Sequence, residues 1–160
     1  MDWLTGKWTW LLDKALAPIK NLILKPEQRE HDKKIFLSAD QLLNEDDVMT
    51  RLDELQSFGT YRSWLLSTEK FYQFFRLSSN QYRDRRLKTA SLKVARNLYD
   101  LLNFLANHFV VRTVEDQYAE KPEYHGEKYD DFVKDCDRKI TAFRKTYIRY
   151  RDLIKRKLNV

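Results

Sequence analysis

Histidine, cysteine and acidic side chains are the groups in this chain that could bind a metal or act as a general base or nucleophile. The chain has three histidines, and His31, His108 and His125 are far apart in sequence. None of them has a second His or Cys at the i, i+4 spacing of a helical zinc site. The single cysteine, Cys136, falls within an apolar helical stripe, where it is expected to be a small buried hydrophobic residue.

The adjacent His31 and Asp32 form the core of some metal phosphohydrolase motifs. Those sites need further His and Asp ligands, and the sequence offers no convincing set. We therefore interpret the pair as exposed residues near the start of a helix. The chain also contains no glycine-rich phosphate loop and no G-x-S-x-G motif. We expect a protein that is not an enzyme, with no cofactor, no metal and no small-molecule substrate.

The composition favours long helices. Among 160 residues there are only three glycines and three prolines, with 42% hydrophobic and 34% charged residues. So few helix breakers leave little material for hairpins. A single cysteine excludes a disulfide within the chain and favours a reducing compartment, so we expect a cytoplasmic protein. No run of about 18 apolar residues is present, so no helix is expected to span a bilayer.

Apolar spacing and helix-breaking residues predict the helices. They cover residues 2–24, with a kink at Pro18, then 27–43, a short helix from an N-cap at Asn44 to about Phe58, Tyr61–Leu77, a long helix to about Val111, and Tyr129–Leu158. Residues 112–127 lose the apolar period and are predicted to form the main loop. The predicted fold is all-α, an antiparallel bundle of about five helices with an amphipathic N-terminal helix. Residues 1–25 form that helix, and residues 26–160 form the bundle domain.

The last two predicted helices carry the clearest apolar stripes. In the last helix the apolar positions alternate between spacings of three and four: Tyr129, Phe132, Cys136, Ile140, Phe143, Tyr147, Tyr150, Ile154 and Leu158. The long helix before it has a similar stripe: Leu87, Val94, Leu98, Leu101, Leu102, Leu105 and Phe109. Such stripes are typical of helix faces that pack against other helices. We expect both to form the centre of the bundle.

Basic residues cluster on the same two helices. The net charge is +6, and residues 76–96 hold seven basic residues and one acid, including Arg83, Arg85 and Arg86. On the last helix, four cations project opposite the apolar stripe, within about 40° of one another at about 100° per residue: Arg138, Lys145, Arg149 and Arg156. They form either a solvated helix face or a ridge that contacts phosphates. Acids in 44–54 and 115–137 are available to pair with these helices, which weakens the phosphate interpretation.

The first 25 residues have their own pattern. Three of the four tryptophans, Trp3, Trp8 and Trp10, lie in the first ten residues beside Lys7 and Lys14. On a helical wheel nine apolar residues share one arc: Leu4, Trp8, Leu11, Leu12, Ala15, Leu16, Ile19, Leu22 and Ile23. Indole rings beside lysines suit a bilayer interface. The alternative is a helix that docks on its own bundle or on another subunit.

Two functions from different classes follow from these patterns. The leading expectation is a non-catalytic interaction or scaffold protein that binds a protein partner or a second copy of itself. It would associate with an anionic membrane surface through the N-terminal helix. The alternative is a basic accessory protein that holds nucleic-acid phosphates without sequence specificity, because no helix-turn-helix, zinc finger or aromatic strand motif accompanies the basic clusters.

Overall fold

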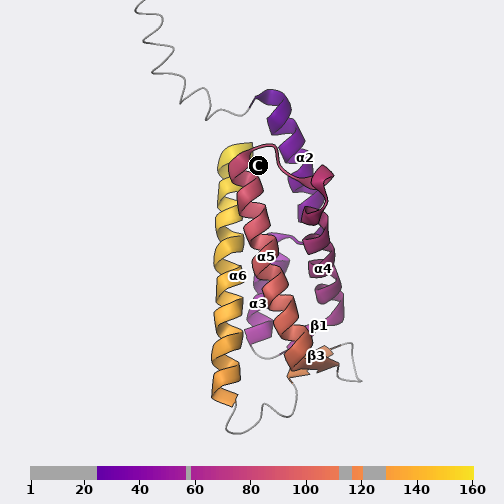
Figure 1. The fold of residues 1–160 in the computed structure, drawn as a ribbon, viewed down its shortest axis with the longest axis vertical. Coiled ribbons are helices and arrows are strands. Elements are labelled where there is room, and N and C mark those ends of the chain that lie inside the picture. Colours follow the sequence, from indigo (N-terminus) through magenta and orange to yellow (C-terminus); the bar gives the residue numbers. More distant parts are fainter. Residues whose placement is uncertain (1–24, 57–58, 112–116, 121–128) are drawn as a thin grey trace, which may run out of the picture.

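The computed structural model describes residues 25–56, 59–111, 117–120 and 129–160, which form an elongated helical bundle (Figure 1). Its described part contains five α-helices: α2 (Pro26–Leu42), α3 (Glu45–Gln56), α4 (Arg62–Arg76), α5 (Arg85–His108) and α6 (Tyr129–Leu158). The two longest, α5 and α6, run antiparallel along the length of the bundle. The all-α bundle predicted from sequence is confirmed, and α6 has the predicted bounds. The predicted N-terminal helix over residues 2–24 lies outside the described residues.

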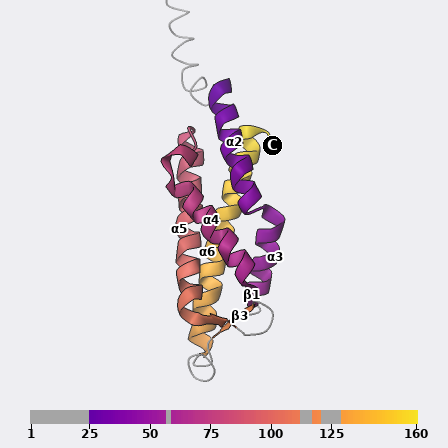
Figure 2. The ribbon, with the colours of Figure 1, turned by 90° about the vertical axis from the view of Figure 1, so that its right-hand side faces the viewer.

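Helices α2 and α3 lie one after the other along the long axis of the bundle (Figure 2). Pro26 begins α2, where a proline costs no hydrogen bond because the first turn has no intrahelical acceptor. Asn44 then caps α3, since its side-chain oxygen accepts a hydrogen bond from the backbone N–H of Asp47 at 2.8 Å. The predicted N-cap is therefore confirmed. Both helices contact α6, and α2 also contacts α4.

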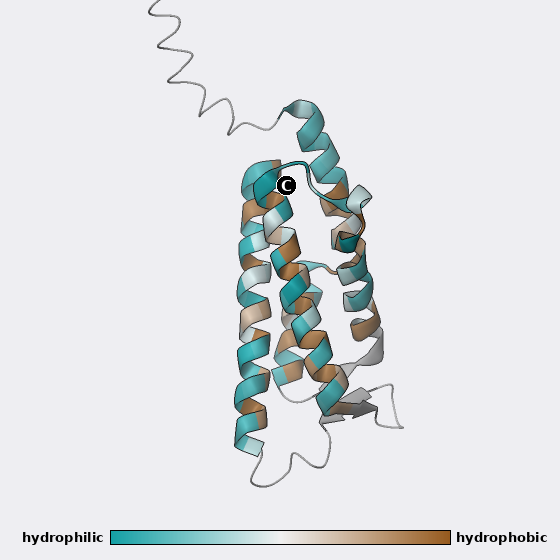
Figure 3. Ribbon diagram, in the orientation of Figure 1, coloured by the Kyte–Doolittle hydropathy of each residue, from teal (hydrophilic) through white to brown (hydrophobic). Residues whose placement is uncertain are grey.

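The core lies between the stripes of α5 and α6. Every predicted stripe residue of α6 from Phe132 to Leu158 is buried, and in the stripe of α5 only Leu102 remains partly exposed. Hydrophobic and hydrophilic bands alternate along both helices (Figure 3). Tyr147 is fully buried and donates its hydroxyl to the backbone carbonyl of Leu43 at 2.9 Å, so its polar atom is satisfied inside the core.

A small sheet closes one end of the bundle, and the sequence did not predict it. Strand β3 (Gln117–Glu120) pairs antiparallel with both β1 (Gly59–Tyr61) and β2 (Phe109–Val111). The prediction was therefore wrong in two places: α5 ends at His108 and not at Val111, and residues 117–120 form a strand and not a loop. Strands of three or four residues are too short to show a period of two.

Asp32 joins α2 to the start of α5. Its two carboxylate oxygens accept the backbone N–H groups of Arg83 at 2.7 Å and Asp84 at 2.9 Å. Asp32 is fully buried, so the interpretation of His31 and Asp32 as an exposed pair was wrong for the acid. The burial is tolerated because both oxygens are hydrogen-bonded. The ring of His31 is half-buried, with Nε2 3.3 Å from the Gln81 carbonyl oxygen.

Candidate interaction surfaces

The predicted ridge on α6 is exposed. Arg138, Lys145, Arg149 and Arg156 lie on the outer side of α6, opposite the buried stripe. Arg138 forms an ion pair with Asp135 on its own helix. The Arg156 Nε donates to the backbone carbonyl of Asp152 at 3.2 Å. Neither contact reaches another helix, so the ridge is open to a partner.

The arginines at the start of α5 lie at the same end of the bundle as Arg156. Arg83, Arg85 and Arg86 are exposed. Nearby, the Lys157 ammonium lies 3.2 Å from the carboxylate of Asp84, the residue that caps α5. Because α5 and α6 are antiparallel, this ion pair places the end of α6 beside the beginning of α5. The structure thus brings together two clusters that are about 70 residues apart in sequence.

A side-chain bridge shows which sides of the two helices adjoin. The Asn97 amide of α5 donates to the Thr146 hydroxyl at 3.0 Å and to the Ala142 carbonyl at 3.3 Å on α6. Residues three or four positions away project from the same side of a helix. Lys93 therefore lies one turn from Asn97, and Arg149 one turn from Thr146.

These cations form one surface, which we call the α5–α6 basic face. Its members are Arg83, Arg85, Arg86, Lys93, Arg138, Lys145, Arg149 and Arg156. Within the described residues, Arg138 is the only member with an ion pair. Five acids lie beside the face, Asp84, Asp100, Asp131, Asp135 and Asp152, and they are fewer than its eight cations. The face is therefore an exposed positive surface.

The acids of α2 and α3 pair with a different flank of α6. Asp40 pairs with Arg151, Glu45 with both Arg151 and Lys155, and Asp53 with Arg144. The sequence left open whether acids in 44–54 would neutralise the predicted ridge. They do pair with α6, but with cations that the sequence had not singled out. The ridge residues are left without these acids as partners.

Arg151 is the centre of this flank. Its side chain is only 11% exposed, and its guanidinium carbon lies 4.8 Å from the ring centroid of Phe36. Burial alone would raise the pKa of Glu45, but the hydrogen bond from Lys155 and the charges of Arg151 and Lys155 lower it. The flank is thus a structural ion-pair network that attaches α2 and α3 to α6.

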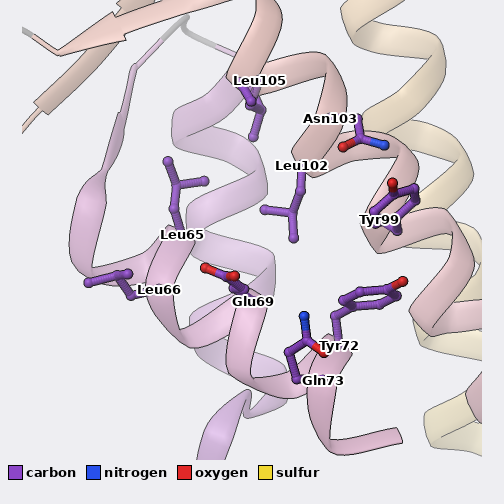
Figure 4. A pocket seen from close by; sticks show the side chains of 10 residues that line it. Leu65, Leu66, Glu69, Tyr72, Gln73, Tyr99, Leu102, Asn103 and Leu105 are labelled. Atoms are coloured by element: carbon purple, nitrogen blue, oxygen red, sulfur yellow. The ribbon is translucent and has the colours of Figure 1, made fainter. Parts of the chain in front are cut away.

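A groove of about 430 Å³ lies between α4 and α5 (Figure 4). The rings of Tyr72 and Tyr99 stack across it with centroids 5.1 Å apart, and the Arg76 guanidinium carbon lies 5.6 Å from the Tyr72 ring centroid. Leucines supply most of the remaining apolar lining: Leu65, Leu66, Leu102 and Leu105. This lining is typical of a surface that binds an apolar partner.

A second hollow, of about 710 Å³, borders the same helix on the side of α2. Leu42, Phe74 and Leu77 contribute apolar surface to it. Glu69 and Gln73 line both hollows, so the two meet along the outer face of α4. We call their combined surface the α4 groove. The sequence predicted a helix over Tyr61–Leu77 but not this groove, because a helical pattern does not specify which helices lie beside one another.

The side chains of Cys136 and His108, which could in principle act in catalysis, pack within the bundle. Cys136 is buried, and burial raises the pKa of its thiol to about 12, so the thiol is protonated at neutral pH. The His108 ring packs 4.3 Å from the Phe104 ring, centroid to centroid. No group of three or more His, Cys, Asp or Glu residues that could hold a metal occurs in the described ranges. His125 lies outside them.

The predicted interface residues of the N-terminal segment, Trp3, Lys7, Trp8, Trp10 and Lys14, also lie outside the described residues. None of the helices that the structure describes is long and apolar enough to cross a membrane. No known protein family, no curated protein and no solved structure matches this chain.

Proposed function

We propose that the protein is a non-catalytic, cytoplasmic interaction protein that attaches reversibly to an anionic membrane surface. Residues 1–25 supply the hydrophobic attachment, and the α5–α6 basic face supplies the charge. The observation that carries this proposal is the excess of cations on that face. Acids are available on α2 and α3, yet they pair with the other flank of α6.

The shape and charge of the face suit a planar anionic surface. The cations of the face extend over 18 residue steps of α6, from Arg138 to Arg156, so at about 1.5 Å per residue the face is about 27 Å long. Each Lys or Arg near an anionic bilayer contributes about 1 kcal/mol, an effect that fades within a Debye length of about 10 Å at 0.1 M salt. Several cations on one face therefore give useful affinity, while the lysines and indoles of residues 1–25 add an interfacial anchor.

The two attachment elements meet at one end of the bundle. The Arg29 guanidinium in the first turns of α2 donates to the Leu158 carbonyl of α6 at 3.0 Å. The chain before Pro26 therefore joins the bundle beside the end of α6. Arg156 and the start of α5 are at this same end. This proximity supports a combined action of the N-terminal segment and the basic face.

Cosedimentation with vesicles tests the proposal. The full chain is expected to sediment with phosphatidylcholine vesicles that contain phosphatidylserine, and much less with phosphatidylcholine alone. Trp3→Ser with Trp10→Ser is expected to weaken binding without unfolding the protein, since neither substitution removes a residue of the described core. Equal binding to neutral and anionic vesicles, or none to either, would contradict the proposal.

Nucleic acid is the second candidate partner, and the composition of the same face favours it. Six of the eight residues in the face are arginines, whose planar guanidinium binds phosphate through two parallel hydrogen bonds. Replacing Arg83, Arg85 and Arg86 together by Gln is expected to weaken binding equally for unrelated sequences. Affinity is also expected to fall by about a thousandfold between about 50 and 200 mM salt. A mobility-shift assay with no complex at low salt would exclude this candidate.

A further inference from the structure

The α4 groove is a candidate docking surface because large apolar side chains are exposed along it. Leu66, Leu77 and Tyr99 are 49%, 57% and 44% exposed. They are three of the seven large hydrophobic side chains exposed in the described part of the chain, and all three line the groove. Contiguous apolar surface of this kind usually marks a binding site.

We propose that residues 4–19 of this chain dock in the α4 groove as a helix, with their apolar arc against α4. This goes beyond the proposed function, because the docked helix buries the same apolar arc that membrane attachment would use. Docked and membrane-attached forms are then alternatives. Membrane attachment would require the segment to leave the groove.

The length of the groove fits this occupant. From Leu65 to Leu77 helix α4 rises about 18 Å, at about 1.5 Å per residue. Residues 4–19 as a helix are about 24 Å long by the same rise. The groove therefore accommodates most of the apolar arc. A docked helix would lie parallel to α4, with residue 8 near Leu66 and residue 19 near Leu77, and residues 4–7 would extend past Leu66.

The position where the segment joins the bundle also fits. Asn80 lines the end of the groove, and its neighbour Gln81 has its carbonyl oxygen 3.3 Å from Nε2 of His31. His31 lies in the second turn of α2, so this end of the groove is close to the start of that helix. Residues 20–25 can span up to about 20 Å when extended, at about 3.3 Å per residue. That reach allows the chain to reverse and enter the groove.

Charges along the groove complement the segment. Glu69 is exposed at the junction of the two hollows and has no ion pair with any described residue. When residue 19 lies beside Leu77, residue 11 lies beside Glu69. Lys7 and Lys14 are then about one helical turn from Glu69, on either side of it along the helix axis. Asp13 lies near the level of Lys70, an exposed cation of the second hollow. The alignment thus places opposite charges beside one another.

Hydrogen exchange on the full chain tests the docking directly. Amides of residues 4–19 should exchange about tenfold more slowly than in the unstructured chain, the protection expected when the segment is docked nine-tenths of the time. Leu66→Lys should remove this protection. Leu37→Lys is the matched control, because Leu37 on α2 is also 49% exposed but lies outside the groove. Neither substitution changes a core residue, so amides of α5 and α6 should stay as protected as in the wild type in both variants.

A dilution series shows whether the groove holds a segment of the same chain or of a second copy. Vesicle binding by Leu66→Lys separates the docking from the proposed membrane function. Protection that is unchanged on about hundredfold dilution supports docking within one chain, whereas protection lost on dilution indicates a second copy and overturns the proposal. Absence of protection in the wild type, or its survival in Leu66→Lys, also overturns it. If the segment is protected but the protein ignores anionic vesicles even after Leu66→Lys, docking stands and the membrane function fails.

Discussion

The Asn97 amide of α5 donates to the Thr146 hydroxyl of α6 at 3.0 Å, and this bond is partly buried between the two helices. The apolar stripes show which faces of α5 and α6 are buried, but not which sides of the two helices lie next to each other. This hydrogen bond shows it. Because of this pairing, Lys93 and Arg149 lie on neighbouring helical surfaces and not on opposite sides. The α5–α6 basic face depends on this relationship.

Phe143 tests the assignment of the hydrophobic core, because its side chain is fully buried in the apolar stripe of α6. Phe143→Asp places an unpaired charge among apolar side chains and should destabilise the fold by about 4 kcal/mol or more, enough to unfold many domains. Thr141→Asp is the control, because Thr141 is exposed on the same helix. Thermal denaturation followed by circular dichroism measures both. A Phe143→Asp variant that melts like the wild type would show that the stripe is wrongly assigned.

Asp32 should matter more than an exposed acid. Asp32→Ala leaves the backbone N–H groups of Arg83 and Asp84 without their acceptor, and each buried unsatisfied donor costs about 1–3 kcal/mol. Urea denaturation should therefore show a loss of about 2–4 kcal/mol. Glu30→Ala, at an exposed position of the same helix, should change stability little. Equal stability of the two variants would contradict the role assigned to Asp32.

Acid sensitivity should depend on Asp84. Burial alone would raise its pKa, but hydrogen bonds from the Leu87 N–H and the Lys157 ammonium lower it below the ordinary value. A lowered folded-state pKa stabilises the protein above the unfolded-state pKa, and this contribution disappears as pH falls through the folded-state value. Asp84→Asn should therefore lower the melting temperature at neutral pH and flatten its decline in acid. An unchanged slope between wild type and variant would argue against this ion pair.

Cys136 should be unreactive in the folded protein. Burial raises the pKa of its thiol to about 12, so very little nucleophilic thiolate exists at pH 8, and the side chain is also inaccessible. A thiol reagent such as dithionitrobenzoate should react slowly with native protein and rapidly in denaturant. Rapid reaction under native conditions would mean that this part of α6 is not buried as described.

The long elements could be predicted from the sequence, while contacts between distant residues could not. The stripe of α6 repeats over 30 residues, so its period identifies both the helix and its buried face. The role of Asp32 depends on N–H groups about 50 positions away, which no local pattern reveals. The same holds for the α4 groove, because helical spacing shows that Tyr72 and Tyr99 lie on helix surfaces but not that their rings stack.

For the α5–α6 basic face, the sequence predicted the exposed cations of α6 but not the ion pairs that leave them without acidic partners from α2 and α3. The sequence identified Arg138, Lys145, Arg149 and Arg156 as one exposed ridge, because their spacing alone places them opposite the stripe. It could not predict that Arg144, Arg151 and Lys155 would take the acids of α2 and α3. That pairing depends on which flank of α6 faces those helices.

The most direct test of the central claim compares two triple variants for binding to phosphatidylserine-containing vesicles. Lys145→Gln, Arg149→Gln and Arg156→Gln remove three cations of the α5–α6 basic face. Lys34→Gln, Lys88→Gln and Lys155→Gln remove three exposed cations of α2, α5 and α6 that lie outside the face and outside the α4 groove. The two variants carry the same net charge.

At about 1 kcal/mol per cation, the first variant should bind at least about tenfold more weakly than wild type, while the second remains within about threefold of it. That difference would assign the attraction to the α5–α6 basic face and not to overall charge. Equal weakening in both variants, or no loss in the first, would contradict the account.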